Sequence, residues 1–191
     1  MVDKPPTTME LAILGLLHQQ PRSGYDVRKV FATSPMGRYS SSPGAIYPAL
    51  RRLESRGLVK GRTDRSRSLK PRRIFTVSEQ GEQALLEWVT RAVTQDDVAL
   101  RMDELMLRFA FMDIAGRRVT RDFLARLAEE IDVRLESLEE VLSEMEGSAL
   151  SHGRLALQAG IDGYRAHGAW ARRALESLES ERSHDEEENR T

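Results

Sequence analysis

The sequence predicts a mainly α-helical protein in two parts, with one two-stranded β hairpin in the first part. Apolar residues recur every three or four positions through most of the 191 residues, as in helices that bury one face. Strand-like patterns occur at residues 58–62 and 73–77. The two halves also differ in charge: residues 1–90 contain 15 Lys and Arg against 8 Asp and Glu, whereas residues 91–191 contain 14 against 22.

Composition excludes several classes of protein. The chain is 40% hydrophobic and 31% charged, which is enough apolar material for real cores. No apolar run approaches the roughly 18 residues of a membrane span, and the first residues lack the apolar core of a signal peptide. Cysteine is absent, which fits a reducing compartment. We therefore expect a cytoplasmic protein without membrane association, whose basic half is the candidate for binding nucleic acid.

The first part begins with two short helices. Residues 1–8 form a loose arm, and the dense apolar content of residues 9–18 predicts a buried first helix. Residues 19–24 contain Pro and Gly and predict a turn. A second helix is expected at residues 25–32, followed by a connection over residues 33–41.

A third helix is expected between Ser42 and Leu58. Ser42 can act as N-cap, Pro43 suits the first helical position, and Gly57 is placed to end the helix. Pro48 requires either that the helix begins late or that it bends there. The residues divide into an apolar stripe of Ile46, Leu50 and Leu53 and an opposite face of Tyr47, Arg51, Arg52 and Arg56. Such a helix suits a DNA major groove, although an ordinary core helix with a solvated arginine face gives the same pattern.

The predicted hairpin after this helix is strongly basic. Seven basic residues lie between Lys60 and Arg73, against the single acid Asp64. Three helices followed by a hairpin form the plan of a winged helix-turn-helix domain, in which arginines of the wing can bind phosphate or enter the minor groove. A solvated charged loop is the alternative interpretation. Ser78 is then a good cap for a further helix with Leu85, Leu86, Trp88 and Val89 on or beside its apolar face.

Several linked segments of residues 7–90 resemble the PadR-type transcriptional regulators. They are Leu11-Ala-Ile-Leu-Gly-Leu-Leu17, Ser23-Gly-Tyr25, Ser42-Pro-Gly-Ala-Ile-Tyr-Pro-Ala-Leu50, Leu53-Glu-Ser-Arg-Gly-Leu-Val59, Arg73-Ile-Phe-Thr-Val77 and Glu79-Gln-Gly81. Phe75 and Val77 depart slightly from the family's usual choices. The resemblance implies a dimeric, cytoplasmic, DNA-binding repressor whose binding is often relieved by a small molecule or another signal.

These considerations predict a set of DNA-binding residues. We expect Tyr47 and Arg51 to contact base edges, Ser42 to place the helix N-terminus on a phosphate, and the wing to contact the backbone. The full set is Ser42, Gly44, Tyr47, Arg51, Arg52, Arg65, Arg67 and Lys70. A dimer would present two such helices about 34 Å apart, which predicts an inverted-repeat operator in double-stranded DNA.

The acidic half predicts long helices after a polar junction at residues 91–99. A helix is expected at residues 100–112, and Thr120 is expected to cap a long helix that runs to about Glu146. A last helix is expected at residues 150–178, where Gly160, Gly163 and Gly168 would allow close approach of a partner. Because one helical hairpin cannot bury such apolar seams alone, we expect a homodimer.

The resulting domain assignment has three parts. Residues 1–92 form the winged helix-turn-helix DNA-binding domain, residues 93–180 form an all-helical dimerisation and effector domain, and residues 181–191 form a disordered acidic tail.

No catalytic motif stands out in the sequence. The four histidines are scattered, and no metal-ligand spacing or Gly-rich phosphate loop is present, so we expect no enzyme activity, no metal site and no cofactor. Met and aromatic side chains that could line an effector pocket are Met102, Met106, Phe109, Tyr164 and Trp170, although the favoured interpretation is that they are core residues. The remaining alternative function is a winged-helix adaptor that binds proteins rather than DNA.

Overall fold

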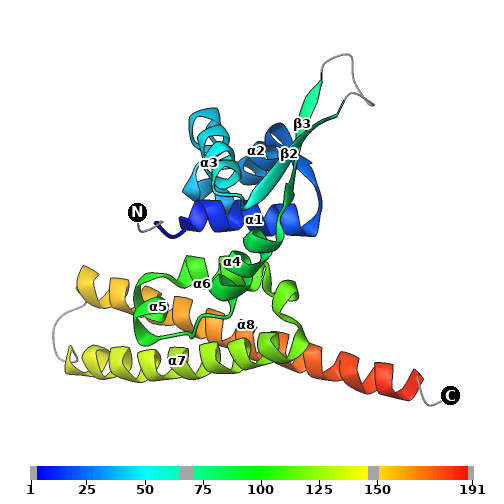
Figure 1. The fold of residues 1–191 in the computed structure, drawn as a ribbon. Helices are drawn as coiled ribbons and strands as arrows, with labels where there is room; N and C mark the ends of the chain where they lie inside the picture. Colours follow the sequence, from blue (N-terminus) through cyan, green and yellow to red (C-terminus); the bar gives the residue numbers. More distant parts are fainter. Residues whose placement is uncertain (1–3, 65–70, 146–150, 189–191) are drawn as a thin grey trace. The chain divides into compact units, whose positions relative to one another are not determined.

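The chain folds into two compact units, Met1–Val89 and Thr90–Thr191, which are coloured along the sequence in Figure 1. The computed structural model describes residues 4–64, 71–145 and 151–188. Helices surround one small antiparallel sheet in the first unit, and the described part of the second unit contains helices and their connections but no strand. This architecture confirms the predicted mainly α fold, with a winged helix-turn-helix followed by a helical region.

The first unit has the element order of a winged helix. Its elements are α1 (Thr8–Gln19), β1 (Arg22–Ser23), α2 (Gly24–Thr33), the 3-10 helix η1 (Pro35–Tyr39), α3 (Pro43–Ser55), β2 (Val59–Asp64), β3 (Arg72–Val77) and α4 (Glu79–Val89). The helix boundaries differ from the expected ones by one or two residues, and a 3-10 turn occupies part of the expected connection over residues 33–41.

Helix α1 lies at the centre of the first unit. A reciprocal capping box between Thr7 and Glu10 begins the helix, and Leu11 through Leu17 are all buried. The helix contacts α3, α4 and β3, and so the core gathers around it. The residues from other elements that fill this core are Val27, Phe31, Ile46, Leu53 and Leu85. One face of α3 is thereby fixed, which leaves its opposite face outward.

The sheet has three strands in the order β1-β3-β2, whereas the sequence predicted only two. The wing strands β2 and β3 pair from Val59 opposite Val77 to Asp64 opposite Arg72. The additional strand β1 contributes two residues, which pair with Phe75 and Ile74. Its short length explains the error, because two residues carry no alternation and the pairing partner is about fifty positions away in the chain.

Helix α4 is joined closely to the end of α3. The Ser78 hydroxyl accepts a hydrogen bond from the Gly81 N–H (3.1 Å) and donates one to the Gly57 carbonyl (2.6 Å), which confirms Ser78 as the cap. A Cβ at Gly81 would lie 2.1 Å from the carbonyl oxygen of Leu58. Glycine is therefore required at this position, because any side chain would push α4 away from the start of β2.

The second unit is built from two short and two long helices. They are α5 (Gln95–Leu100), α6 (Met102–Phe109), α7 (Arg117–Glu144) and α8 (His152–Glu188), with a 3-10 turn η2 (Met112–Ala115). The expected polar junction at residues 91–99 is thus wrong over α5, which begins with a capping box between Thr94 and Asp97. The single helix expected at residues 100–112 is also wrong, because the chain turns at Arg101 and again after Phe109.

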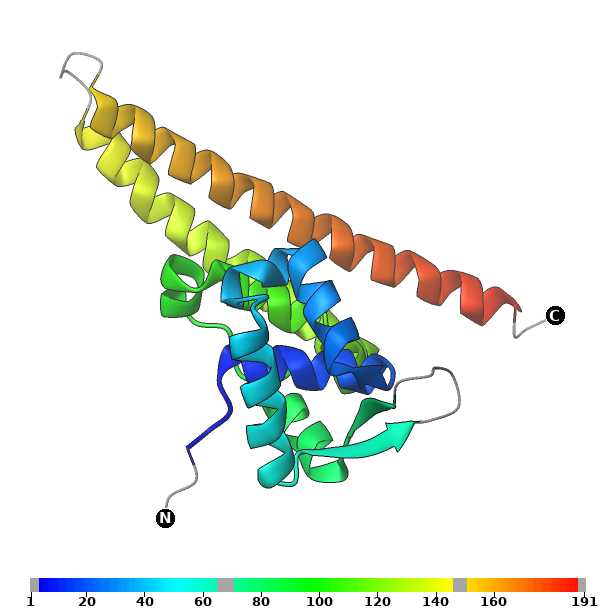
Figure 2. The same cartoon turned by 90° about the horizontal axis from the view of Figure 1, so that it is seen from above.

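Helices α7 and α8 form a long hairpin, which Figures 1 and 2 both show. Helix α7 begins at Arg117 after Gly116, whose φ of 78° favours glycine, so Thr120 is inside the helix and is not the cap we expected. Helices α7 and α8 contact each other, and the buried apolar side chains of the hairpin include Phe123, Leu124, Leu127 and Ile131 in the first half of α7 and Ile161 and Ala171 on α8. Farther along, Val133 and Val141 on α7 are exposed, as is Leu155 on α8.

Helix α8 continues to Glu188, eight residues into the segment expected to be a disordered tail. Glu supplies four of residues 181–188 and is a good helix former, so a high charge density does not by itself end a helix. Within the described ranges, none of the helices, α8 included, combines the length and apolarity that crossing a bilayer requires.

Candidate nucleic-acid interface

Helix α3 has well-defined ends that follow from its sequence. Pro43 occupies the first helical position, and Gly57 follows the last turn with a φ of 73°. The N–H of Leu58 donates to the carbonyl of Leu53 (2.9 Å) and that of Gly57 to the carbonyl of Glu54 (3.0 Å), the pattern of a Schellman motif. The predicted termination at Gly57 is confirmed, and it turns the chain directly into the wing.

The outward face of α3 carries polar and aromatic side chains. Ile46, Leu50 and Leu53 are buried beneath it, whereas Tyr47 is 39% exposed and Arg51 is exposed. We find no ion pair or hydrogen bond for the Arg51 guanidinium among the described residues. Arg51 is therefore available to an external partner.

The sequence left two questions about the start of α3: whether the Ser42 side chain caps the helix, and where Pro48 lies within it. Ser42 occupies the N-cap position, but its hydroxyl makes no capping hydrogen bond and instead lies 3.2 Å from the Ser40 hydroxyl. The expected capping role of its side chain is therefore wrong. Pro48 lies within the helix, beyond its first turn, and cannot donate to the Gly44 carbonyl. The Gly44 carbonyl, which lacks its usual i+4 donor, and the exposed Ser42 hydroxyl thus both lie at this end of α3.

Arg52 pairs with a buried acid of α1. Its Nε donates to Glu10 Oε1 at 2.7 Å, and the Glu10 side chain is only 3% exposed. Burial raises the pKa of Glu10, but the Thr7 backbone N–H and the Arg52 guanidinium outweigh burial, so the pKa falls below its ordinary value. Arg52 therefore joins α3 to α1, a structural contact that the sequence interpretation as a DNA-binding residue did not include.

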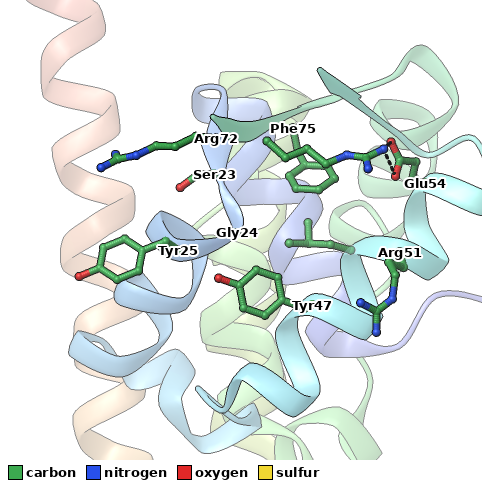
Figure 3. A pocket seen from close by; sticks show the side chains of 10 residues that line it. Ser23, Gly24, Tyr25, Tyr47, Arg51, Glu54, Arg72 and Phe75 are labelled. Carbon is green, nitrogen blue, oxygen red and sulfur yellow. Dashed lines mark hydrogen bonds and ion pairs between the residues drawn. The ribbon is translucent and has the colours of Figure 1, made fainter. Parts of the chain in front are cut away.

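Glu54 joins α3 to both strands of the wing. Its Oε1 accepts a hydrogen bond from the Gly61 N–H of β2 at 3.0 Å. Arg73 of β3 donates from Nη2 to Oε1 at 2.7 Å and to Oε2 at 2.8 Å, the contact dashed in Figure 3. Arg73 also lies over the Phe75 ring, 5.7 Å from its centroid. The last turn of α3 is thus attached to the wing by charge-assisted bonds.

A concavity of about 500 Å³ lies between α3, the start of α2 and β3 (Figure 3). Its lining residues are Ser23, Gly24, Tyr25, Tyr47, Leu50, Arg51, Glu54, Arg72, Arg73 and Phe75. Leu50 and Phe75 give it an apolar floor, and three arginines give it a basic rim. It brings predicted residues Tyr47 and Arg51 together with Tyr25 and Arg72, which the sequence did not single out.

Two tyrosines border this concavity from α2 and α3. The Tyr47 ring packs on Gly24 so closely that a Cβ at Gly24 would lie 2.5 Å from Tyr47 Cε1. Tyr25 is exposed, and the Arg28 guanidinium lies over its ring at 5.3 Å. The Gly24 position therefore has a physical reason: it makes room for the aromatic side chain that α3 presents.

Three of the predicted wing contacts cannot be placed. Arg65, Arg67 and Lys70 lie outside the described residues. The described part of the wing carries exposed cations on both strands, at Lys60, Arg62, Arg72 and Arg73. The basic character expected of the wing thus extends down its strands to the edge of the concavity.

The five candidate effector-pocket residues do not gather around one hollow. Met102 and Tyr164 line a depression of about 300 Å³, together with Val98, Ala99, Leu100, Asp103, Gly160, Gly163 and His167. Phe109 and Trp170 instead pack edge to face at 4.9 Å, and Phe109 also stacks with Phe123 at 6.3 Å. Met106 is half-buried on α6. Their three-to-four-residue spacing placed them on helix faces but could not separate these two locations.

Arg108 is a buried cation that the sequence did not reveal. Its side chain is fully buried, its guanidinium lies over the Phe123 ring at 5.2 Å, and it donates a hydrogen bond to the Arg91 carbonyl. Burial, with repulsion from Arg91, lowers the pKa of Arg108 to about 10. Its position in α6, which also carries Asp103 and Glu104, gave no signal of burial beyond its apolar neighbours Leu107 and Phe109.

Two family models match the chain, one in each unit. Residues 13–87 match the transcriptional regulator PadR-like family. The first unit is a PadR-like domain, the type found in transcriptional regulators of that family. Residues 102–179 match the virulence activator alpha C-term model, which covers α6, α7 and most of α8. The resemblance inferred from the linked sequence segments is thereby confirmed.

Individual proteins similar to this chain agree with the PadR-like family model. The negative transcriptional regulator PadR of Bacillus subtilis (strain 168) is 26% identical over 141 residues, which cover 74% of this chain and 76% of the relative. The transcriptional regulator YqjI of Escherichia coli (strain K12) is 32% identical over 79 residues, 41% of this chain and 36% of that protein. A crystal structure of Bacillus subtilis PadR in complex with operator DNA is 23% identical, covers 90% of this chain and 99% of that one, and has a TM-score of 0.43.

The residues of this concavity that sequence reasoning missed share one property. Tyr25, Glu54 and Arg72 belong to three different elements, and only the packing of α2, α3 and β3 brings them to one concavity. Tyr25 and Glu54 do lie in segments that match the family, Ser23-Gly-Tyr25 and Leu53-Glu-Ser-Arg-Gly-Leu-Val59. Those family-matching segments were the sequence signal that could have identified Tyr25 and Glu54.

Proposed function

We propose that this PadR-type regulator binds duplex DNA sequence-specifically, with α3 in the major groove and the wing on the backbone. The observation that carries the proposal is the outward face of α3. Tyr47 and Arg51 are exposed there over a buried apolar stripe, and Arg51 has no partner among the described residues. Arginine can make a paired hydrogen bond to guanine, and helix termini favour phosphate near Ser42 and Gly44.

We further propose that the protein acts in the cytoplasm as a dimeric repressor. Support for repression comes from the Bacillus subtilis relative named a negative regulator, which aligns with three quarters of this chain. Support for a dimer comes from apolar side chains that one protomer leaves exposed on its second unit, namely Leu100, Val133, Val141 and Leu155. A second copy would cover them, and its two-fold symmetry would match an inverted-repeat operator.

A small-molecule effector is the third part of the proposal. The depression lined by Met102 and Tyr164 combines apolar side chains with polar groups from Asp103 and His167. Because this depression lies on the unit that would form the dimer, a bound ligand would be able to change the spacing of the two recognition helices. Isothermal titration with candidate ligands tests this part, and Tyr164→Ala should abolish the heat of binding.

The decisive experiment measures DNA binding of the full chain across salt concentrations. We expect log Kd to change linearly with log salt on a duplex from its own promoter region, because phosphate contacts release counterions. An unrelated duplex of equal length should bind more weakly at every salt concentration. A salt-independent or undetectable interaction would contradict the proposal and favour a protein-binding adaptor.

A further inference from the structure

The acid on the concavity requires an explanation. Glu54 lies on the proposed DNA-facing surface, where a carboxylate should repel phosphate. It is half-buried and accepts all three of its described hydrogen bonds from the wing: one from the Gly61 N–H and two from Arg73. Its carboxylate is therefore occupied by this unit's own strands rather than directed at an external base.

Gly61 makes this contact possible. A Cβ at Gly61 would lie 2.6 Å from Glu54 Oε1 and 2.6 Å from Arg73 Nε, and 3.1 Å from Phe75. Any side chain at position 61 would thus displace the carboxylate or the guanidinium. The absence of a side chain lets Glu54 reach the backbone of β2 while it also binds β3.

The contact lies where the wing has little other support. The third strand, β1, pairs with β3 only at Phe75 and Ile74, so β3 extends beyond it toward Arg72. From that point the wing continues as a two-stranded ribbon, in which Thr63 pairs with Arg73 and Asp64 with Arg72. Two-stranded ribbons have marginal stability by themselves and twist readily. Glu54 therefore attaches the ribbon to α3 at the place where the three-stranded sheet ends.

We infer that Glu54 is a positioning residue for DNA binding: its carboxylate fixes the wing against the recognition helix. With the wing held, cations such as Arg62 and Arg72 meet phosphates while α3 occupies the groove. This inference rests on the proposed DNA-binding function. The competing account gives Glu54 no positioning role and treats it only as a negative charge that weakens DNA binding. The two accounts predict opposite signs for its neutralisation.

The test uses four variants of the full chain: Glu54→Gln, Gly61→Ala, the double variant that combines them, and the control Glu79→Gln. Glu54→Gln removes the charge that holds Arg73, and Gly61→Ala displaces the carboxylate with no change in charge. Glu79 is an exposed acid at the start of α4, so its replacement matches the charge change of Glu54→Gln. Fluorescence anisotropy on operator and unrelated duplexes, at several salt concentrations, gives Kd and its salt slope. Thermal unfolding verifies that each variant is folded.

Both wing variants should bind the operator and unrelated DNA more weakly. Loss of one phosphate contact weakens binding about eightfold at 0.1 M salt and reduces the salt slope by about 0.9. The double variant should be no weaker than either single one, because both remove the same contact. If a variant only reduced the fraction of folded protein, the amplitude of the anisotropy change would fall, but the salt slope of Kd would stay unchanged. Glu79→Gln should leave Kd unchanged or slightly lower.

Two outcomes would overturn the inference. Tighter binding by Glu54→Gln, equal to that of Glu79→Gln, would show that Glu54 acts only as a charge. An unchanged salt slope in Gly61→Ala would show that the wing does not depend on the carboxylate, and this variant decides the matter if Glu54→Gln does not fold. Failure of the wild-type chain to bind DNA in a salt-dependent way would instead contradict the proposed function itself.

Discussion

Replacing Arg52 with alanine should destabilise the first unit, whereas the same replacement at its neighbour Arg51 should not. Arg52 is the cation that faces Glu10, a carboxylate only 3% exposed. Breaking a buried ion pair on one side costs about 3–5 kcal/mol. Because the Arg52 side chain is 53% exposed, water screens much of this interaction, and we expect a loss of about 1–2 kcal/mol. Arg51→Ala removes the same charge without such a partner and should cost less than about 0.5 kcal/mol.

The assay is urea unfolding followed by fluorescence of a single tryptophan. Trp88 lies in the first unit and is nearly buried, whereas Trp170 lies in the second unit. A Trp170→Phe background keeps an aromatic ring against Phe109 and leaves Trp88 as the reporter of the first unit. At an m-value of about 1 kcal/mol/M, Arg52→Ala should lower the midpoint by about 1 M or more. Equal midpoints for the Arg51 and Arg52 variants would refute the structural role of Arg52.

The same comparison has a defined pH dependence. The folded-state pKa of Glu10 lies below its ordinary value of 4.5, so ionised Glu10 contributes stability above that pH. That contribution is lost as the pH falls through the folded-state pKa. The stability difference between wild type and Arg52→Ala should therefore be full at pH 7 and shrink steadily below about pH 4.5. A difference that persists undiminished under acid would mean that Arg52 stabilises the unit through packing alone.

Three further predictions follow from the packing and from the sequence. Gly81→Ala should destabilise the first unit by about 1–3 kcal/mol, because its methyl group would meet the Leu58 carbonyl. A Cβ at Gly160 would meet nothing within 4 Å, so Gly160→Ala should cause no such loss, and urea unfolding compares the two variants. Truncation after Arg91 should abolish dimerisation in light scattering, and a truncated chain that is still dimeric would refute the assignment of the interface. Arg65→Ala with Arg67→Ala should weaken binding to all DNA sequences and reduce the salt slope by about one to two, and an unchanged slope would exclude these residues from the backbone contact.

The sequence was informative at most positions where a residue acts through its own backbone neighbours, although the expected side-chain caps Ser42 and Thr120 were wrong. Pro43 and Gly57 delimit α3, and Ser78 caps α4, because each acts on hydrogen bonds within a few positions. Thr94 and Asp97 carried the same type of signal for α5, but the polar composition around them was interpreted as a junction. Local signals thus predicted most of the elements and failed mainly where the apolar content was low.

Contacts between distant elements could not be predicted in this way. Arg51 and Arg52 are adjacent and chemically identical, yet one is free of ion pairs among the described residues and the other binds Glu10, 42 positions away. The pairing of β1 with β3 and the attachment of Glu54 to Arg73 are equally long-range. The periodicity of α3 identified the residues at the centre of its outward face. The contacts of residues at the edges of that face depend on packing against other elements, which periodicity does not encode.

The measurement that tests the central claim most directly is the effect of Arg51→Ala on discrimination between operator and unrelated DNA. Footprinting first locates the operator in the protein's own promoter, where we expect an inverted repeat with half-sites about one helical turn apart. Anisotropy titrations then compare Arg51→Ala with Arg118→Ala, an exposed arginine of the second unit with the same charge change. Arg51→Ala should weaken operator binding by about 1–3 kcal/mol with little effect on unrelated DNA, and Arg118→Ala should leave both unchanged. Equal weakening of operator and unrelated DNA by Arg51→Ala would contradict the claim that this face of α3 contacts bases.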